Sequence, residues 1–163
     1  MSDMPNKRFK SVPLYQVDAF ADEVFCGNPA AVCPVQGTLP ERLMLSIASE
    51  NNLSETAFVD LSVTPYEIRW FTPVTEVDLC GHATLAAARI LFDEFLGPEV
   101  NEVDLDSKSG RLRVLKKGPL MVLDFPKDEP SEREANPLIE EILGVCPKTI
   151  FRGRADFLVI FNS

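Results

Sequence analysis

The chain has 163 residues, of which 45% are hydrophobic, and carries a net charge of −9. This length and hydrophobic fraction are sufficient for a globular core and exclude a chain that is mainly disordered. The acidic balance, with no cluster of Lys or Arg, argues against a nucleic-acid partner, although a local pocket could still bind a small anion.

The N-terminal segment MSDMPNKRFKSV is polar and lacks the apolar core of a signal peptide. No apolar run reaches the roughly 20 residues that a membrane span needs. We therefore expect a flexible N-terminus over residues 1–12, no membrane association and a cytoplasmic location. The cysteines are widely spaced and are expected to be reduced thiols: Cys26, Cys33, Cys80 and Cys146.

The first elements follow from alternation and turn residues. Residues 13–20 alternate and carry aromatics, which predicts a strand, and an apolar stretch over 30–35 follows the Gly27-Asn28-Pro29 turn. Residues 38–41 match a capping box with Pro just inside the helix start. The helix is expected to end at Asn51-Asn52, because Asn tolerates the left-handed conformation.

The middle of the chain predicts short strands around one Ala-rich helix. That helix is expected to begin at about Ala83 and to run to Gly97-Pro98. Strands are predicted at 56–61, 67–71, 103–105, 111–115 and 120–125.

A composition break marks the C-terminal part. Residues 126–135, PKDEPSEREA, are charged and Pro-rich, and a short helix from Pro137 to Gly144 and a strand at 157–161 follow. We predict a first α+β domain over 13–127, and over 128–163 a linker and the incomplete beginning of a second domain.

The order of elements favours an α+β fold. Several antiparallel-looking strands accompany two substantial helices, which indicates a curved, mostly antiparallel sheet wrapped around a helix. The sequence contains neither a Gly-rich phosphate loop nor a dinucleotide-binding fingerprint.

Three polar clusters interrupt apolar surroundings. The first is the segment 26–29, whose spacing alone indicates a turn after a strand and no functional role. The second is Ser54-Glu55, between a helix end and a strand. A glutamate there is either a solvated loop carboxylate or a partly desolvated group that can take up and return a proton.

The third cluster, Cys80-Gly81-His82, lies at the start of the Ala-rich helix and contains the only histidine of the chain. Free backbone N–H groups there could cradle a carboxylate. Alternatively, His82 merely caps the helix and Cys80 is a small, buried hydrophobic residue. The spacing predicts no metal site, and we do not expect residues two apart to face each other as a nucleophilic pair.

Together, the three clusters resemble a known family. The segments YQVDAF…FCGNPAAVC, LSETAFV and IRWFTPVTEVDLCGHATLAAARIL match, in order and spacing, the signature blocks of the PhzF-like phenazine-biosynthesis isomerases. The resemblance is close over residues 13–125. It implies the diaminopimelate-epimerase/proline-racemase fold, in which two similar α+β halves close over a substrate.

The resemblance also implies roles for particular residues. Glu55 would be the catalytic acid/base, and the substrate, a small unsaturated or amino carboxylic acid, would contact Ser54, Gly81, His82 and Asn28. A proton would leave one carbon and return to another without a metal or cofactor. The family's D-P-V-T-G-S block, which faces the glutamate, has no match here.

Two alternatives remain open. A racemase or epimerase of the same fold would use Cys80 as its base, whereas a binding module would keep the fold without catalysis. Because a hydrophobic strand is expected near the C-terminus, we also predict self-association, most simply as a homodimer, and no isomerase activity of this chain alone.

Overall fold

A computed structural model describes residues 11–162 except residues 24, 126, 135, 136 and 155. Most of the predicted flexible N-terminus therefore lies outside the described residues. The chain divides into two compact units, one ending at Phe125 and one beginning at Pro126. None of the helices in the described ranges is long and apolar enough to span a membrane.

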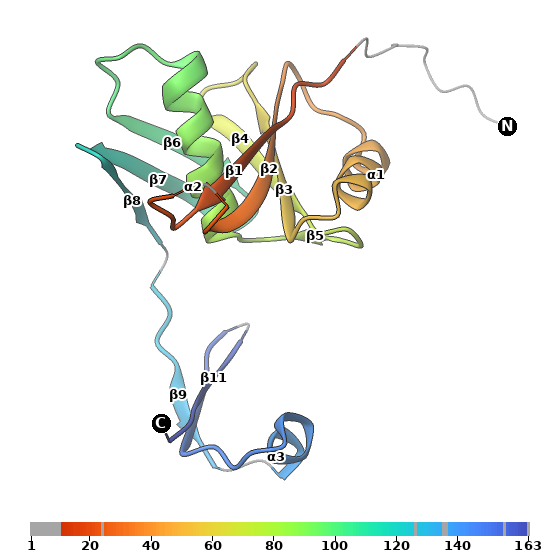
Figure 1. Cartoon of the computed structure of the whole chain (residues 1–163), viewed down its shortest axis with the longest axis vertical. Coiled ribbons are helices and arrows are strands. Elements are labelled where there is room, and N and C mark those ends of the chain that lie inside the picture. Colours follow the sequence, from red (N-terminus) through yellow and green to blue (C-terminus); the bar gives the residue numbers. More distant parts are fainter. Residues whose placement is uncertain (1–10, 24, 126, 135–136, 155, 163) are drawn as a thin grey trace, which may run out of the picture. The chain divides into compact units, whose positions relative to one another are not determined.

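The first unit is a curled sheet of eight strands (Figure 1). The strand order is β1-β2-β3-β4-β6-β7-β8, with β5 paired to β4. Among these described strands, only the β2–β3 and β4–β6 pairs are parallel, so the predicted α+β class with a mostly antiparallel sheet is confirmed. The strands are β1 (Tyr15–Ala19), β2 (Asn28–Val35), β3 (Glu55–Asp60), β4 (Tyr66–Phe71), β5 (Glu76–Val77), β6 (Glu102–Ser107), β7 (Gly110–Lys117) and β8 (Leu120–Asp124).

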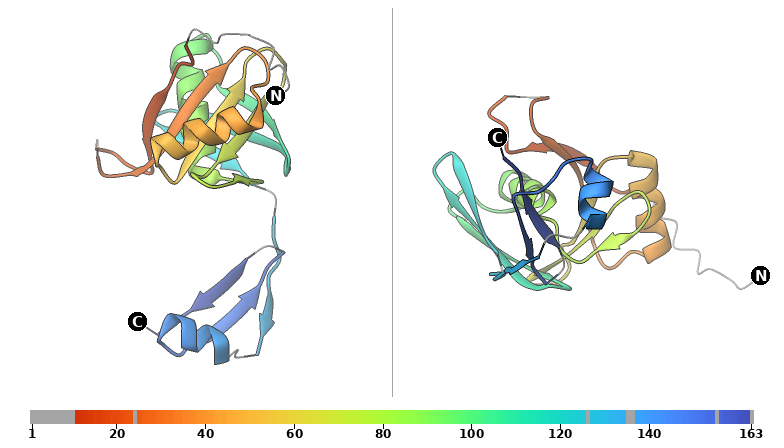
Figure 2. Two further views of the ribbon diagram at one scale, coloured as in Figure 1. Left: turned by 90° about the vertical axis from the view of Figure 1, so that its right-hand side faces the viewer. Right: turned by 90° about the horizontal axis from the view of Figure 1, so that it is seen from below.

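Helix α2 (Gly81–Ile90) lies inside the curl and continues as one π-helical turn, η1 (Leu91–Phe95). The two edge strands of the sheet, β1 and β8, both contact α2, as a half-barrel requires (Figure 2, right). Close approach is possible because the buried face of α2 is built mainly of alanine: Ala83, Ala86, Ala87 and Ala88 are at most 1% exposed. The principal core therefore lies between α2 and the concave face of the sheet.

Helix α1 (Glu41–Asn51) covers the opposite face of the sheet (Figure 2, left). Its predicted end is confirmed, because Asn52 adopts the left-handed conformation with φ of 51°. The predicted capping box is wrong: the residue before the helix is Pro40, and no described side chain caps it. The Thr38 side chain instead donates to the Asp60 carboxylate on β3, so it is not free to cap the helix.

The second unit contains β9 (Ser131–Arg133), α3 (Pro137–Leu143), β10 (Thr149–Arg152) and β11 (Phe157–Ile160), with strand order β11-β10-β9. Strand β10 was not predicted from the sequence. Ile150 is buried, whereas several apolar side chains are exposed, among them Leu138, Ile142, Phe157 and Leu158. That this unit begins a second epimerase-like domain stays a prediction.

An ion-pair network ties α1, β4, β5 and the β6–β7 turn together. Both guanidinium nitrogens Nε and Nη2 of Arg69 lie 2.7 Å from the Glu76 carboxylate, and Lys108 Nζ lies 2.5 Å from the same group. Arg69 also contacts Glu41 of α1 at 3.2 Å. The pKa of Glu76 is lowered to about 2, chiefly by the hydrogen bonds from Arg69 and also by Lys108, while burial opposes both.

This network predicts a specific loss of stability in acid. The folded pKa of Glu76, about 2, lies below the ordinary value of 4.5, so its stabilisation is complete above about pH 4.5 and is lost as the pH falls toward 2. We expect Glu76→Gln to lower the free energy of unfolding by about 2 kcal/mol at neutral pH. The difference from the unmodified chain should vanish near pH 2. Urea unfolding between pH 2 and 7 measures this.

Glu102→Gln is the matched control, since the Glu102–Arg113 ion pair is about half exposed on both sides. We expect it to cost less than about 0.5 kcal/mol. Equal effects of the two substitutions at pH 7 would contradict a special role for Glu76.

Candidate active site

Glu55 is the first residue of β3 and points to the α2 side of the sheet. Side chains alternate along a strand, so Glu55 shares its face with Ala57 and Val59, which both pack in the α2 core. The Glu55 side chain is 19% exposed. The loop position predicted as one alternative is therefore excluded, and the carboxylate is partly desolvated at the strand entrance.

Cys80 and His82 are placed by the start of α2. Cys80 precedes the helix in an extended conformation, and its carbonyl accepts the backbone N–H of Thr84 at 3.2 Å and the Thr84 hydroxyl at 2.5 Å. His82 lies in the first turn, with a side chain that is only 10% exposed. Its Nε2 atom is buried, whereas the residue as a whole keeps some exposed area.

The three side chains meet although they come from two separate segments. His82 Nε2 lies 3.3 Å from Glu55 Oε2, and Cys80 Sγ lies 3.4 Å from His82 Nδ1. The prediction that residues two apart do not face each other is therefore wrong here. It applies to positions within a helix, whereas Cys80 stands before the helix with an extended backbone.

The contact between Glu55 and His82 is close but poorly aligned. Neither Glu55 Oε2 nor His82 Nε2 has a hydrogen-bond partner among the described residues, although both atoms are buried. Most buried polar atoms in proteins are paired, so two facing unpaired atoms mark a place where a ligand or a proton can be accommodated.

Burial suppresses ionisation of the Cys80 thiol. The pKa of Cys80 is raised to about 12, chiefly by removal of the thiol from water and also by the nearby Glu55 carboxylate, while the backbone N–H groups of Ala83 and His82 oppose the rise. A thiol of this kind is almost entirely protonated near neutral pH. Cys80 is therefore seldom available as a base.

Two further site residues predicted from the sequence, Asn28 and Ser54, lie at the β2 and β3 end that carries Glu55. Asn28 begins β2 and shares the face of Ala30, whose register partner is Glu55, so it lies at the same end of the sheet. Ser54 directly precedes Glu55 and is exposed.

The space next to the Cα atom of Gly81 is occupied by an aromatic side chain, whereas the sequence predicted that a substrate would contact this residue. A Cβ atom at this position would lie 2.5 Å from Cζ of Phe125. The glycine therefore makes room for the Phe125 ring at the end of β8, a contact that sequence reasoning missed because the two residues are far apart in the chain.

Another residue distant in sequence, Trp70, lies in the same buried core as Cys80. Trp70 of β4 pairs in register with Ala57, and its indole N–H is buried without a hydrogen-bond partner among the described residues. It is the single tryptophan of the chain, and its burial was not predicted.

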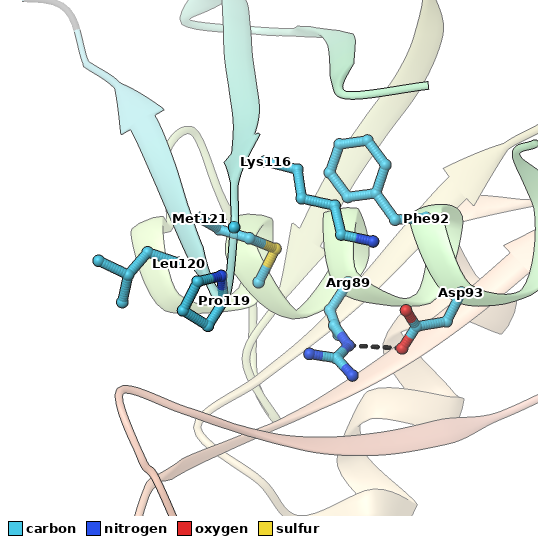
Figure 3. Close-up of a pocket in the computed structure, with 8 residues that line it drawn as sticks. Arg89, Phe92, Asp93, Lys116, Pro119, Leu120 and Met121 are labelled. Atoms are coloured by element: carbon cyan, nitrogen blue, oxygen red, sulfur yellow. Dashed lines mark hydrogen bonds and ion pairs between the residues drawn. The ribbon is translucent and has the colours of Figure 1, made fainter. Parts of the chain in front are cut away.

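A cavity of about 110 Å³ lies at the other end of α2 (Figure 3). It is lined by Arg89 and Asp93, which form an ion pair, and by residues of the β7–β8 turn. Because Arg89 lies about two helical turns from His82, this cavity does not adjoin the Glu55 cluster.

The half-barrel around a single helix defines the class of epimerase-like α+β folds. A predicted epimerase of Pseudomonas aeruginosa aligns with a TM-score of 0.68 over 86% of this chain and 56% of its own, and at 22% identity this likeness shows the fold alone. The model of the PhzC-PhzF family, described as phenazine biosynthesis-like protein, matches residues 17–140. The chain belongs to this family.

Relatives with higher identity support the assignment. An uncharacterized isomerase of Halalkalibacterium halodurans is 44% identical over 156 residues, which cover 94% of this chain and 58% of the relative. The solved structure of a PhzF-family protein of Enterococcus faecalis aligns with a TM-score of 0.81 and 45% identity, covering 93% of this chain and 58% of that one. The chain thus spans somewhat over half the length of these relatives.

Proposed function

We propose that the site catalyses a proton-shift isomerisation of a small unsaturated or amino carboxylic acid, with Glu55 as the acid/base. The observation that carries this proposal is the buried carboxylate oxygen of Glu55 facing His82 Nε2 at 3.3 Å at the start of α2. The isomerase names of the relatives support the reaction class.

In the proposed reaction, the Glu55 carboxylate removes a proton from a carbon next to an unsaturated acid group. The electron pair of the broken C–H bond spreads over the conjugated system and the substrate carboxylate. The backbone N–H groups in the first turn of α2, together with Asn28 and Ser54, would hold that carboxylate. Protonated Glu55, whose proton can exchange with water, then delivers a proton to another carbon, so no further reactant is consumed.

Incubation with a panel of dienoic and amino acids in heavy water tests the proposal. Because the chain covers 58% of the Enterococcus faecalis relative, the full chain is assayed alone and also joined to the remaining C-terminal part of that relative. Deuterium uptake at substrate carbon by the joined form, and none by the chain alone, is the expected result in NMR spectra. Binding without deuterium uptake in either form would favour a binding module over an enzyme.

Substitution of Cys80 separates carboxylate from thiol chemistry. We expect Cys80→Ser to retain the exchange reaction to within about tenfold, because a buried thiol with a pKa of about 12 is a poor base. If Cys80 were the base, serine would be nearly inactive, since its hydroxyl ionises far less readily. Initial exchange rates of the two proteins, compared at saturating substrate, give the answer.

A further inference from the structure

Glu55, Cys80 and His82 together offer the atoms of a metal site. One carboxylate oxygen, the sulfur and one ring nitrogen all lie within 4.8 Å of one another. Spacing along the chain, which predicted no metal site, compares only neighbours in sequence. It does not apply to this set, because Glu55 comes from β3 and the other two residues from the start of α2.

The separations are compatible with a four-coordinate cation. Ligand atoms at about 2.0–2.3 Å from a tetrahedral metal are roughly 3.3–3.8 Å apart. The Glu55 Oε2–His82 Nε2 separation of 3.3 Å falls in this range. Cys80 Sγ lies 3.4 Å from the other ring nitrogen, Nδ1, and one ligand atom from each of the three residues lies within 4.8 Å of the other two. A change of the Cys80 or His82 rotamer would bring the sulfur and the carboxylate to the same ring nitrogen.

The surroundings favour a cation rather than an anion. Glu55 Oε2 and His82 Nε2 are both buried, and neither has a hydrogen-bond partner among the described residues. An ionised carboxylate oxygen is an acceptor, and Nε2 is an acceptor in the tautomer that carries its proton on Nδ1. A cation between them would satisfy both. The chain as a whole carries a charge of −9, which attracts cations.

We propose that Glu55, Cys80 and His82 bind one thiophilic divalent cation of the zinc type and leave its fourth position open. Binding displaces the Cys80 thiol proton, which passes to the solvent. Bound metal occupies the oxygen of Glu55 that would take the substrate proton. Metal binding and proton transfer therefore exclude each other, and only this consequence rests on the proposed function.

Titration of the full chain with Co²⁺ tests the site directly, because a cobalt–thiolate bond gives a near-ultraviolet charge-transfer band. The exposed thiols are first removed as Cys26→Ser and Cys146→Ser. We expect the band to saturate at about one equivalent and to be displaced by Zn²⁺. Adding Cys80→Ser should abolish the band, whereas adding Cys33→Ala, at the other buried thiol, should leave it intact.

A second pair of variants tests Glu55 as the carboxylate ligand. We expect Glu55→Gln to weaken Co²⁺ affinity by about tenfold or more, and Glu99→Gln, on an exposed turn, to leave it unchanged. A band that survives Cys80→Ser, or an affinity unaffected by Glu55→Gln, would overturn the proposed ligand set.

The inhibitory consequence is measured separately. Deuterium exchange should persist in EDTA and fall with added Zn²⁺ in parallel with the binding curve. Exchange that disappears in EDTA would overturn mutual exclusion. If no substrate exchanges at all, the proposed function fails, while the cobalt titration still decides the metal site.

Discussion

Replacement of Glu55 by Gln is expected to reduce deuterium exchange about 1000-fold, the largest effect of any single substitution considered. Gln preserves the size of the side chain and can still accept a hydrogen bond, but it cannot take up and return a proton. Because Gln has nearly the same shape and Glu55 Oε2 has no hydrogen-bond partner among the described residues to lose, we expect little change in the free energy of unfolding. Initial exchange rates by NMR and urea unfolding curves measure the two quantities.

Glu99→Gln controls for the loss of one negative charge at an exposed position. It should exchange deuterium at the unmodified rate. Retention of more than about a tenth of the exchange rate by Glu55→Gln would remove Glu55 from the acid/base role. Inactivity of both variants would indicate a general effect of charge.

Enlargement of Ala87 on α2 is expected to cost about 3 kcal/mol of folding free energy. Ala87 is completely buried where the sheet curls around the helix, so Leu at this position would force the strands and α2 apart. Because the start of the same helix carries Cys80 and His82, their contacts with Glu55 should be disturbed as well. Denaturant unfolding measures the loss of stability.

Ser49→Leu is the control on α1, where another small side chain is replaced by Leu but the position is exposed. Leu has a somewhat higher helix propensity than Ser, so the free energy of unfolding should rise slightly, by less than about 0.5 kcal/mol. A tolerated Ala87→Leu would show that the half-barrel can expand, contrary to the close packing observed around α2.

Local sequence signals identified most helices and strands but not every hydrogen-bond partner of their side chains. The Asn52 stop was predictable, because a left-handed helix end depends on one residue and its neighbours. The capping box failed for the opposite reason: Thr38 had a competing acceptor, Asp60, that is distant in sequence. Strand β10 was missed because its four residues, Thr149–Arg152, contain only two apolar side chains, whereas β11 is a continuous apolar run.

The sequence by itself determined the α+β class, the family and the segments that carry Ser54-Glu55 and Cys80-Gly81-His82. These follow from periodicity and from motifs that are continuous in the chain. Only the tertiary structure decided that Glu55 and His82 face each other at 3.3 Å without a hydrogen bond, that the Cys80 thiol is buried, and that Phe125 covers Gly81. Such contacts depend on how the sheet curls around α2, and the register and curvature of a sheet are set by long-range pairing that no local pattern records.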